Sequence, residues 1–131
     1  MYWGRSLGGA VAAYATTVRR PDGLVLESTF PDKVSVIRLN PVLRLLNVFA
    51  SYTFPTTTFL EGFDRPTLVI HGDADSIVPY AGARRVYEAV SGPRTLVTIP
   101  GGDHNDVYGP EAAEYWRAVD EFIDARAQGR R

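Results

Sequence analysis

The sequence predicts an α/β fold with a mostly parallel sheet of about four strands and flanking helices. Three observations lead to this prediction. Short runs rich in β-branched and apolar residues alternate with helical stretches, which is the order of βαβ units. Three of these runs are nearly continuously apolar, as suits strands of a sheet covered on both faces. The 131 residues are 45% hydrophobic and 22% charged, which is ordinary for one folded domain.

The N-terminal part of the chain is predicted to form a strand, a helix and a second strand. Tyr2 and Trp3 have the character of the tail of a strand that ends at Gly4. A helix with a small, largely apolar face is expected from residue 7 to about residue 19. The turn signal Pro21-Asp22-Gly23 ends this helix, and a short strand of buried type follows at residues 23–27.

Residues 30–64 form the least regular segment of the sequence. We expect a single domain over residues 1–131, with a small cap-like insert at about residues 30–64. The insert contains an apolar run with helical character at residues 42–49, followed by aromatics and threonines around Pro55. The apolar run could line an acyl-chain pocket over the site. The alternative, that it simply covers the sheet, is at least as well supported.

The C-terminal half contains two further strands and two helices. The strands are expected at residues 67–71 and 94–99, and an amphipathic helix lies between them at residues 80–90. A final helix begins after Pro110, a favourable first-turn residue. Its expected apolar face consists of Ala113, Trp116, Val119, Phe122 and Ile123. Residues 126–131 are expected to be a frayed polar tail.

Composition excludes several classes of function. The net charge of −1 gives no electrostatic case for nucleic acid or an anionic membrane as a partner. The absence of cysteine excludes disulfides, thiolate zinc sites and a cysteine nucleophile. No apolar run approaches the roughly 20 residues that span a bilayer, and the residues after Met1 have no signal-peptide pattern. We therefore expect a soluble, cytoplasmic protein without a transmembrane segment.

The segment Gly4-Arg5-Ser6-Leu7-Gly8 fits the pattern G-x-S-x-G of a nucleophile elbow. Such an elbow is a sharp strand-to-helix turn, and we expect both flanking glycines to be required for its tightness and for close helix packing. The pattern alone is weak, and its alternative is a glycine-rich turn with a capping serine. Because it follows a strand and opens an alanine-rich helix, we favour Ser6 as a nucleophile.

An acid and a base follow the next two long strands. The loop His71-Gly72-Asp73-Ala74-Asp75 begins where a strand ends, at the sheet edge where catalytic groups gather. We assign Asp75 to orient a histidine, and Asp73 to turn chemistry. The loop after the following strand contains His104, whose ordinary pKa suits a general base. His71 is expected only to brace its own loop.

These polar residues allow two other interpretations. His104 could be a plain surface residue, but the chain order Ser, Asp, His matches a known order of serine triads. A metal site could be built from Asp73, Asp75, Asp103, His104 and Asp106. No tight ligand motif such as H-E-x-x-H is present, so the triad is favoured and neither metal nor cofactor is expected.

Four motifs in this order together resemble the α/β-hydrolase family. They are residues 4–12, 26–30, 71–79 and 102–106. The nearest branch is that of the small-cap serine hydrolases, which include lysophospholipase-like and depalmitoylating enzymes. The resemblance implies a triad of Ser6, Asp75 and His104, with the backbone N–H of Leu7 as one oxyanion donor. It also implies a small acyl-ester substrate, cleaved at an ester or thioester bond without a cofactor.

The resemblance covers only the C-terminal portion of such a hydrolase, so we expect a partial α/β-hydrolase fold. The elbow begins at residue 4, whereas such hydrolases have strands and helices before it, and one early loop there carries the second oxyanion donor. We therefore expect impaired activity, and self-association through an exposed sheet edge. Two alternatives stay open: a non-catalytic remnant or subunit of an α/β hydrolase, and a prolyl-oligopeptidase-like serine peptidase.

Overall fold

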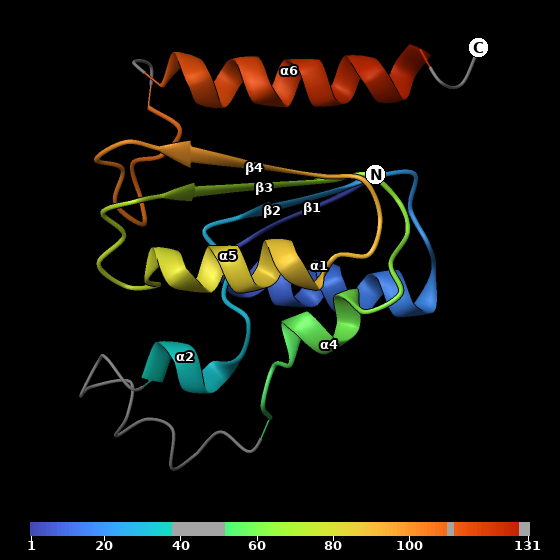
Figure 1. Cartoon of the computed structure of the whole chain (residues 1–131), viewed down its shortest axis with the longest axis horizontal. Coiled ribbons are helices and arrows are strands. Elements are labelled where there is room, and N and C mark those ends of the chain that lie inside the picture. Colours follow the sequence, from blue (N-terminus) through green and yellow to red (C-terminus); the bar gives the residue numbers. More distant parts are fainter. Residues whose placement is uncertain (38–51, 110–111, 129–131) are drawn as a thin grey trace.

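A computed structural model describes residues 1–37, 52–109 and 112–128. Within them, a parallel sheet has the order β1-β2-β3-β4 (Figure 1). The strands are β1 (Tyr2–Arg5), β2 (Leu24–Glu27), β3 (Thr67–Gly72) and β4 (Arg94–Ile99). The helices are α1 (Leu7–Val18), α2 (Lys33–Ile37), α4 (Thr56–Leu60), α5 (Tyr80–Ala89) and α6 (Ala113–Gln128). The predicted α/β fold with a four-stranded parallel sheet and flanking helices is confirmed.

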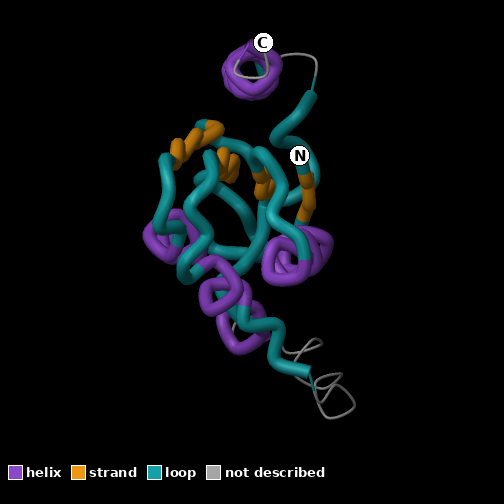
Figure 2. The backbone as a smooth tube through the Cα atoms, turned by 90° about the vertical axis from the view of Figure 1, so that its right-hand side faces the viewer, coloured by secondary structure: helices purple, strands orange, loops and turns teal. Residues whose placement is uncertain are grey.

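The helices divide between the two faces of the sheet. The strands follow one another across the sheet in chain order, so every crossover steps in the same direction. Right-handed crossovers in one direction place their helices on one face. Helices α1, α4 and α5 accordingly lie below the sheet in Figure 1, and α6, which follows the last strand, covers the other face (Figures 1 and 2).

The two faces of the sheet bury separate core clusters because successive side chains of a strand point to opposite faces. Leu24, Leu26 and Val69 join the cluster that faces α1, α4 and α5. Val25 and Leu68, which alternate with them, join the cluster that faces α6. All residues of β2 and β3 are buried, as their apolar runs predict.

The buried face of α6 differs from the predicted one. Val119 is buried as expected, but the side chains of Trp116 and Ile123 are 45% and 38% exposed, and Tyr115 is buried in their place. Tyr115 fits there because its ring packs in the core while its hydroxyl donates to Glu27 Oε2 at 3.0 Å. The helix also continues to Gln128, beyond the point where a frayed tail was expected. No helix among the described residues is long and apolar enough to cross a membrane.

The predicted insert is described only in part. Residues 42–49, the apolar run considered for a pocket, lie outside the described residues. Within the described part, α2 leaves the sheet and α4 returns to it (Figure 1). Leu60 of α4 is fully buried in the core cluster beneath the sheet, with Phe59 packed against it. This returning part of the segment therefore covers the sheet.

Candidate active site

Ser6 occupies the turn between β1 and α1 with a backbone conformation that non-glycine residues rarely adopt. Its φ is 51° and its ψ is −121°. Such a backbone persists only where surrounding contacts enforce it. The Ser6 N–H donates to the Glu27 carbonyl at 2.8 Å, and Thr29 Oγ1 donates to the Ser6 carbonyl at 2.8 Å. The last residue of β2 and the loop that follows it therefore hold the turn that presents the Ser6 hydroxyl.

The glycines around this turn differ in whether a side chain would fit at their position. A Cβ on Gly4 would stand 2.2 Å from the carbonyl oxygen of Gly8, so strand and helix meet too closely for a side chain. A Cβ on Gly9 would stand 2.4 Å from Thr29 Oγ1. Apart from its chain neighbours and the nearby backbone of its own helix, no atom of the described residues lies within 4 Å of the Cβ position of Gly8. The expectation that Gly8 is sterically required is therefore wrong, because Gly9 is the residue that packs closely.

Asp75 lies in the loop after β3 with its side chain fully buried. Its Oδ1 accepts hydrogen bonds from the backbone N–H groups of Ile77 at 2.9 Å and Val78 at 2.7 Å. Its Oδ2 lies 2.8 Å from Nδ1 of His104 and 3.1 Å from Nε2 of His71. These donors compensate the loss of water around a buried carboxylate and fix its orientation.

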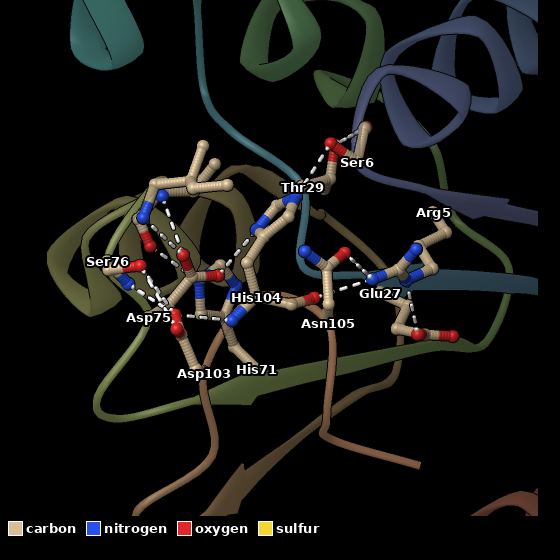
Figure 3. A network of polar contacts seen from close by, with 12 residues as sticks. Arg5, Ser6, Glu27, Thr29, His71, Asp75, Ser76, Asp103, His104 and Asn105 are labelled. Atoms are coloured by element: carbon tan, nitrogen blue, oxygen red, sulfur yellow. Dashed lines mark hydrogen bonds and ion pairs between the residues drawn. The ribbon is translucent and has the colours of Figure 1, made fainter. Parts of the chain in front are cut away.

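Ser6, His104 and Asp75 lie in one hydrogen-bonded row (Figure 3). Because Asp75 as a carboxylate can only accept, His104 Nδ1 donates to it. The other ring nitrogen, Nε2, is 3.0 Å from Ser6 Oγ and is left to accept the hydroxyl proton. The three side chains come from the carboxyl ends of β1, β3 and β4, and the structure thus joins the three predicted residues. Such a row can withdraw the serine proton during nucleophilic attack.

His71, in β3, is completely buried beside this row. Its Nε2 lies 2.8 Å from the carbonyl oxygen of Val78, which requires Nε2 to carry a proton. Its Nδ1 is buried without a hydrogen-bond partner among the described residues. Burial lowers the pKa of His71 below its ordinary value of 6.5, so the ring is neutral near pH 7. His71 therefore braces the loop that carries Asp75, as the sequence suggested.

Two further aspartates tie the acid loop to the histidine loop. Asp103 Oδ1 accepts from the N–H groups of Ser76 and His104, each at 2.7 Å, and from the Ser76 hydroxyl at 2.8 Å. The hydrogen bond from the Ser76 backbone, followed by that from His104, lowers the pKa of Asp103 below 3.8. Asp73 Oδ1 accepts from the Gly101 N–H at 2.6 Å. Asp73 thus has the turn role predicted for it, but across two loops.

Sequence reasoning did not identify Arg5 and Glu27 as parts of this site. Arg5 pairs with the buried Glu27 and donates to the backbone oxygen of His104 (Figure 3). The signal that could have found them is Glu27 itself, because a charged residue that ends a buried apolar strand requires a partner.

The described residues contain no group of three His, Cys, Asp or Glu side chains that could hold a metal ion. Asp73, Asp75 and Asp103 direct their oxygens to N–H donors of the neighbouring loops instead.

Comparison with known proteins shows one family match and several longer relatives. Residues 51–126 match the model of an α/β-hydrolase family described as TAP-like protein. The uncharacterized protein Rv2307c of Mycobacterium tuberculosis is 36% identical over 106 residues, which are 80% of this chain and 37% of that protein. The alpha/beta hydrolase domain-containing protein WAV2 of Arabidopsis thaliana is 28% identical over 148 residues, covering 98% of this chain and 48% of that protein. The chain thus spans less than half the length of these curated relatives.

Solved structures show the same fold at lower sequence identity. The esterase Est1E from Butyrivibrio proteoclasticus has a TM-score of 0.74 and 21% identity, covering 96% of this chain and 60% of that one. The acylaminoacyl peptidase of Pyrococcus horikoshii has a TM-score of 0.78 and 14% identity, covering 93% and 23%. At these identities the likeness supports the fold. The narrower placement beside lysophospholipase-like enzymes stays a prediction.

Proposed function

Since the chain belongs to the TAP-like family of α/β hydrolases, we propose that it is a serine hydrolase that cleaves carboxylic esters or thioesters. The observation that carries this proposal is the row of Ser6, His104 and Asp75. Its two contacts of 3.0 Å and 2.8 Å are both within hydrogen-bond range. The proposed substrate is a small acyl ester, and the proposed chemistry needs no cofactor.

In the proposed reaction, the Ser6 hydroxyl attacks the acyl carbonyl while His104 Nε2 takes its proton. Asp75 holds the imidazole in the tautomer that leaves Nε2 free and stabilises the imidazolium that forms. The imidazolium then returns the proton to the departing alcohol or thiol, leaving an acyl group on Ser6. Water, activated by the same nitrogen, releases the acid and restores the hydroxyl.

The backbone N–H of Leu7 is the proposed oxyanion donor. Leu7 is the first residue of α1, and the first N–H groups of a helix have no partner within the helix. The N-terminal end of a helix also carries partial positive charge, which favours an oxyanion beside it. A donor of this kind contributes on the order of 10²–10³-fold to the rate.

A fluorophosphonate probe tests the proposal directly, because it reacts only with an activated serine. We expect labelling of the purified chain at Ser6 and its loss in Ser6→Ala. Ser91→Ala, which removes an exposed hydroxyl outside the site, is the matched control and should label like the unaltered chain. Labelling that survives Ser6→Ala, or no labelling of the unaltered chain, would contradict the proposal.

The bond type and the acyl pocket need a second measurement. Hydrolysis rates are compared for a p-nitrophenyl ester, the matching thioester and the matching anilide, each with acetyl and with medium-length acyl groups. We expect the ester and thioester to be cleaved faster than the anilide, whereas faster anilide cleavage would indicate a peptidase. A preference for the medium-length acyl group would support an acyl pocket, and indifference to its length would remove it.

A further inference from the structure

Arg5, the last residue of β1, joins several parts of the site (Figure 3). Its Nη2 donates to the backbone oxygen of His104 at 2.6 Å and to Oδ1 of Asn105 at 2.8 Å. Its Nε lies 3.0 Å from Oε1 of Glu27, in an ion pair without the alignment of a hydrogen bond. Its guanidinium lies over the ring of Tyr108, 5.2 Å from the ring centroid. One side chain thus links β1 with the end of β2 and with the loop after β4.

Glu27 anchors this cation in the interior. Its side chain is only 4% exposed, and it stands opposite Arg5 in the register of β1 and β2, so both side chains point to the same face of the sheet. Its Oε2 accepts from the Tyr115 hydroxyl at 3.0 Å and from Trp3 Nε1 at 3.4 Å. A carboxylate taken out of water requires a counter-ion, so Glu27 keeps the Arg5 guanidinium in one place.

The contacts of Arg5 bear on the distance between nucleophile and base. Arg5 directly precedes Ser6, and its guanidinium donates to the backbone carbonyl of His104. The Arg5 side chain therefore connects the backbone next to Ser6 directly with the backbone of His104. On its other side, the same loop is held to the acid loop by Asp103 and Ser76. Arg5 supplies the link to the strand that carries the nucleophile.

We propose that Arg5 is a positioning residue, which holds the His104 loop at proton-transfer distance from Ser6 with Glu27 as its buried anchor. The inference rests on the proposed function. A guanidinium suits the task because its planar fork donates in several fixed directions at once. A lysine ammonium at this position keeps the charge beside Glu27 but does not span to the His104 carbonyl in the same geometry.

The first test measures the rate of fluorophosphonate labelling at Ser6. We expect Arg5→Ala to lower this rate on the order of 10²-fold, because small misplacements of reacting groups have effects of this size. Arg5→Lys should lower the rate by less, on the order of 10-fold. Arg20→Ala is the matched control, since it removes an exposed arginine paired with Asp64, and should leave the rate unchanged.

The second test measures the position of His104 without any chemistry. The proton on His104 Nδ1 gives a downfield proton resonance, identified by its absence in His104→Ala. We expect this resonance to broaden by exchange with water in Arg5→Ala and Arg5→Lys, and to stay sharp in Arg20→Ala. Amide spectra and urea unfolding check that each variant is folded. If Arg5→Ala does not fold, Arg5→Lys carries both tests.

The outcomes separate the two proposals. An unlabelled wild-type chain rejects the proposed function, while the Nδ1 resonance still decides whether Arg5 positions His104. The inference is overturned if the wild-type chain is labelled at Ser6 and the folded Arg5 variants are labelled at the same rate and keep a sharp resonance. Slower labelling accompanied by a broadened resonance in both Arg5 variants supports it.

Discussion

Asp75 and Glu27 are two carboxylates buried near the same end of the sheet, and their surroundings differ. Asp75, with a fully buried side chain, accepts from two backbone N–H groups and faces the rings of His104 and His71. Glu27, 4% exposed, faces the guanidinium of Arg5 and accepts from a tyrosine hydroxyl and an indole N–H. One acid thus faces imidazole rings, whose nitrogens can accept as well as donate a proton, and the other faces groups that only donate to it.

The comparison shows that burial alone does not indicate which acid takes part in chemistry. The guanidinium beside Glu27 has no nitrogen that can accept a proton from a nucleophile, so this pair is structural. Histidine beside Asp75 can accept a proton when one is withdrawn from a neighbour. Burial also raises the pKa of Tyr115, so its hydroxyl stays protonated and continues to donate to Glu27. Substitutions at Asp75, Glu27 and His71 test this difference between the two acids.

The largest effect is expected from Asp75→Asn. An amide in place of the carboxylate offers a donor to His104 Nδ1 and so favours the wrong tautomer, which costs on the order of 10⁴-fold in turnover. The measurement is kcat for an activated ester. Asp73→Asn, a change of the same kind in the same loop, should cost far less, because the Asp73 carboxylate accepts from the backbone of Gly101 and not from the His104 ring. Equal losses in both variants would count against the role given to Asp75.

Glu27→Gln should instead act mainly on stability. It leaves Arg5 without its counter-ion, and since the Arg5 side chain is 34% exposed, water offsets part of the penalty. We expect the free energy of unfolding to fall by about 1–2 kcal/mol, measured by urea denaturation. Glu61→Gln, at an exposed position, serves as the control and should change little. A Glu27→Gln variant as stable as the wild type would show that this pair is not an anchor.

The smallest effect is expected on the pH dependence of stability. It involves His71, which lies beside Asp75 and not beside Glu27. Because burial lowers the pKa of His71, the unfolded chain takes up a proton more readily than the folded one. Its contribution to stability is therefore present above pH 6.5 and is lost as the pH falls through the lowered pKa. In His71→Gln, which keeps a donor near Val78, the loss of stability between pH 7 and pH 5 should be smaller.

Urea denaturation at pH 7 and pH 5 tests whether His71 causes this loss of stability. The midpoints are compared for wild type, His71→Gln and Glu27→Gln. Glu27→Gln should lose as much stability on acidification as the wild type does, because this variant keeps the buried His71. If His71→Gln loses as much stability between pH 7 and pH 5 as the wild type, the pH dependence does not come from His71.

Much of the fold followed from local patterns. The elbow, the strand at residues 94–99 and the helix from residue 80 were predicted close to their observed bounds, because each has its own glycine, proline or apolar signal. The face of α6 was predicted less well. Tyr115 is buried and Trp116 exposed because of a hydrogen bond to Glu27, which lies 88 residues away in the chain. Helical spacing within α6 contains no information about that partner.

The sequence by itself determined the identity and order of Ser6, Asp75 and His104, and the parallel strands that end beside them. Only the tertiary structure decided how these side chains are held: which glycine packs closely, which oxygen each N–H reaches, and that Arg5 meets the backbone of His104 across 99 residues. The physical reason lies in the range of the interactions. Strand and turn signals act between neighbours in the chain, whereas the contacts of a buried charge depend on which strands lie side by side.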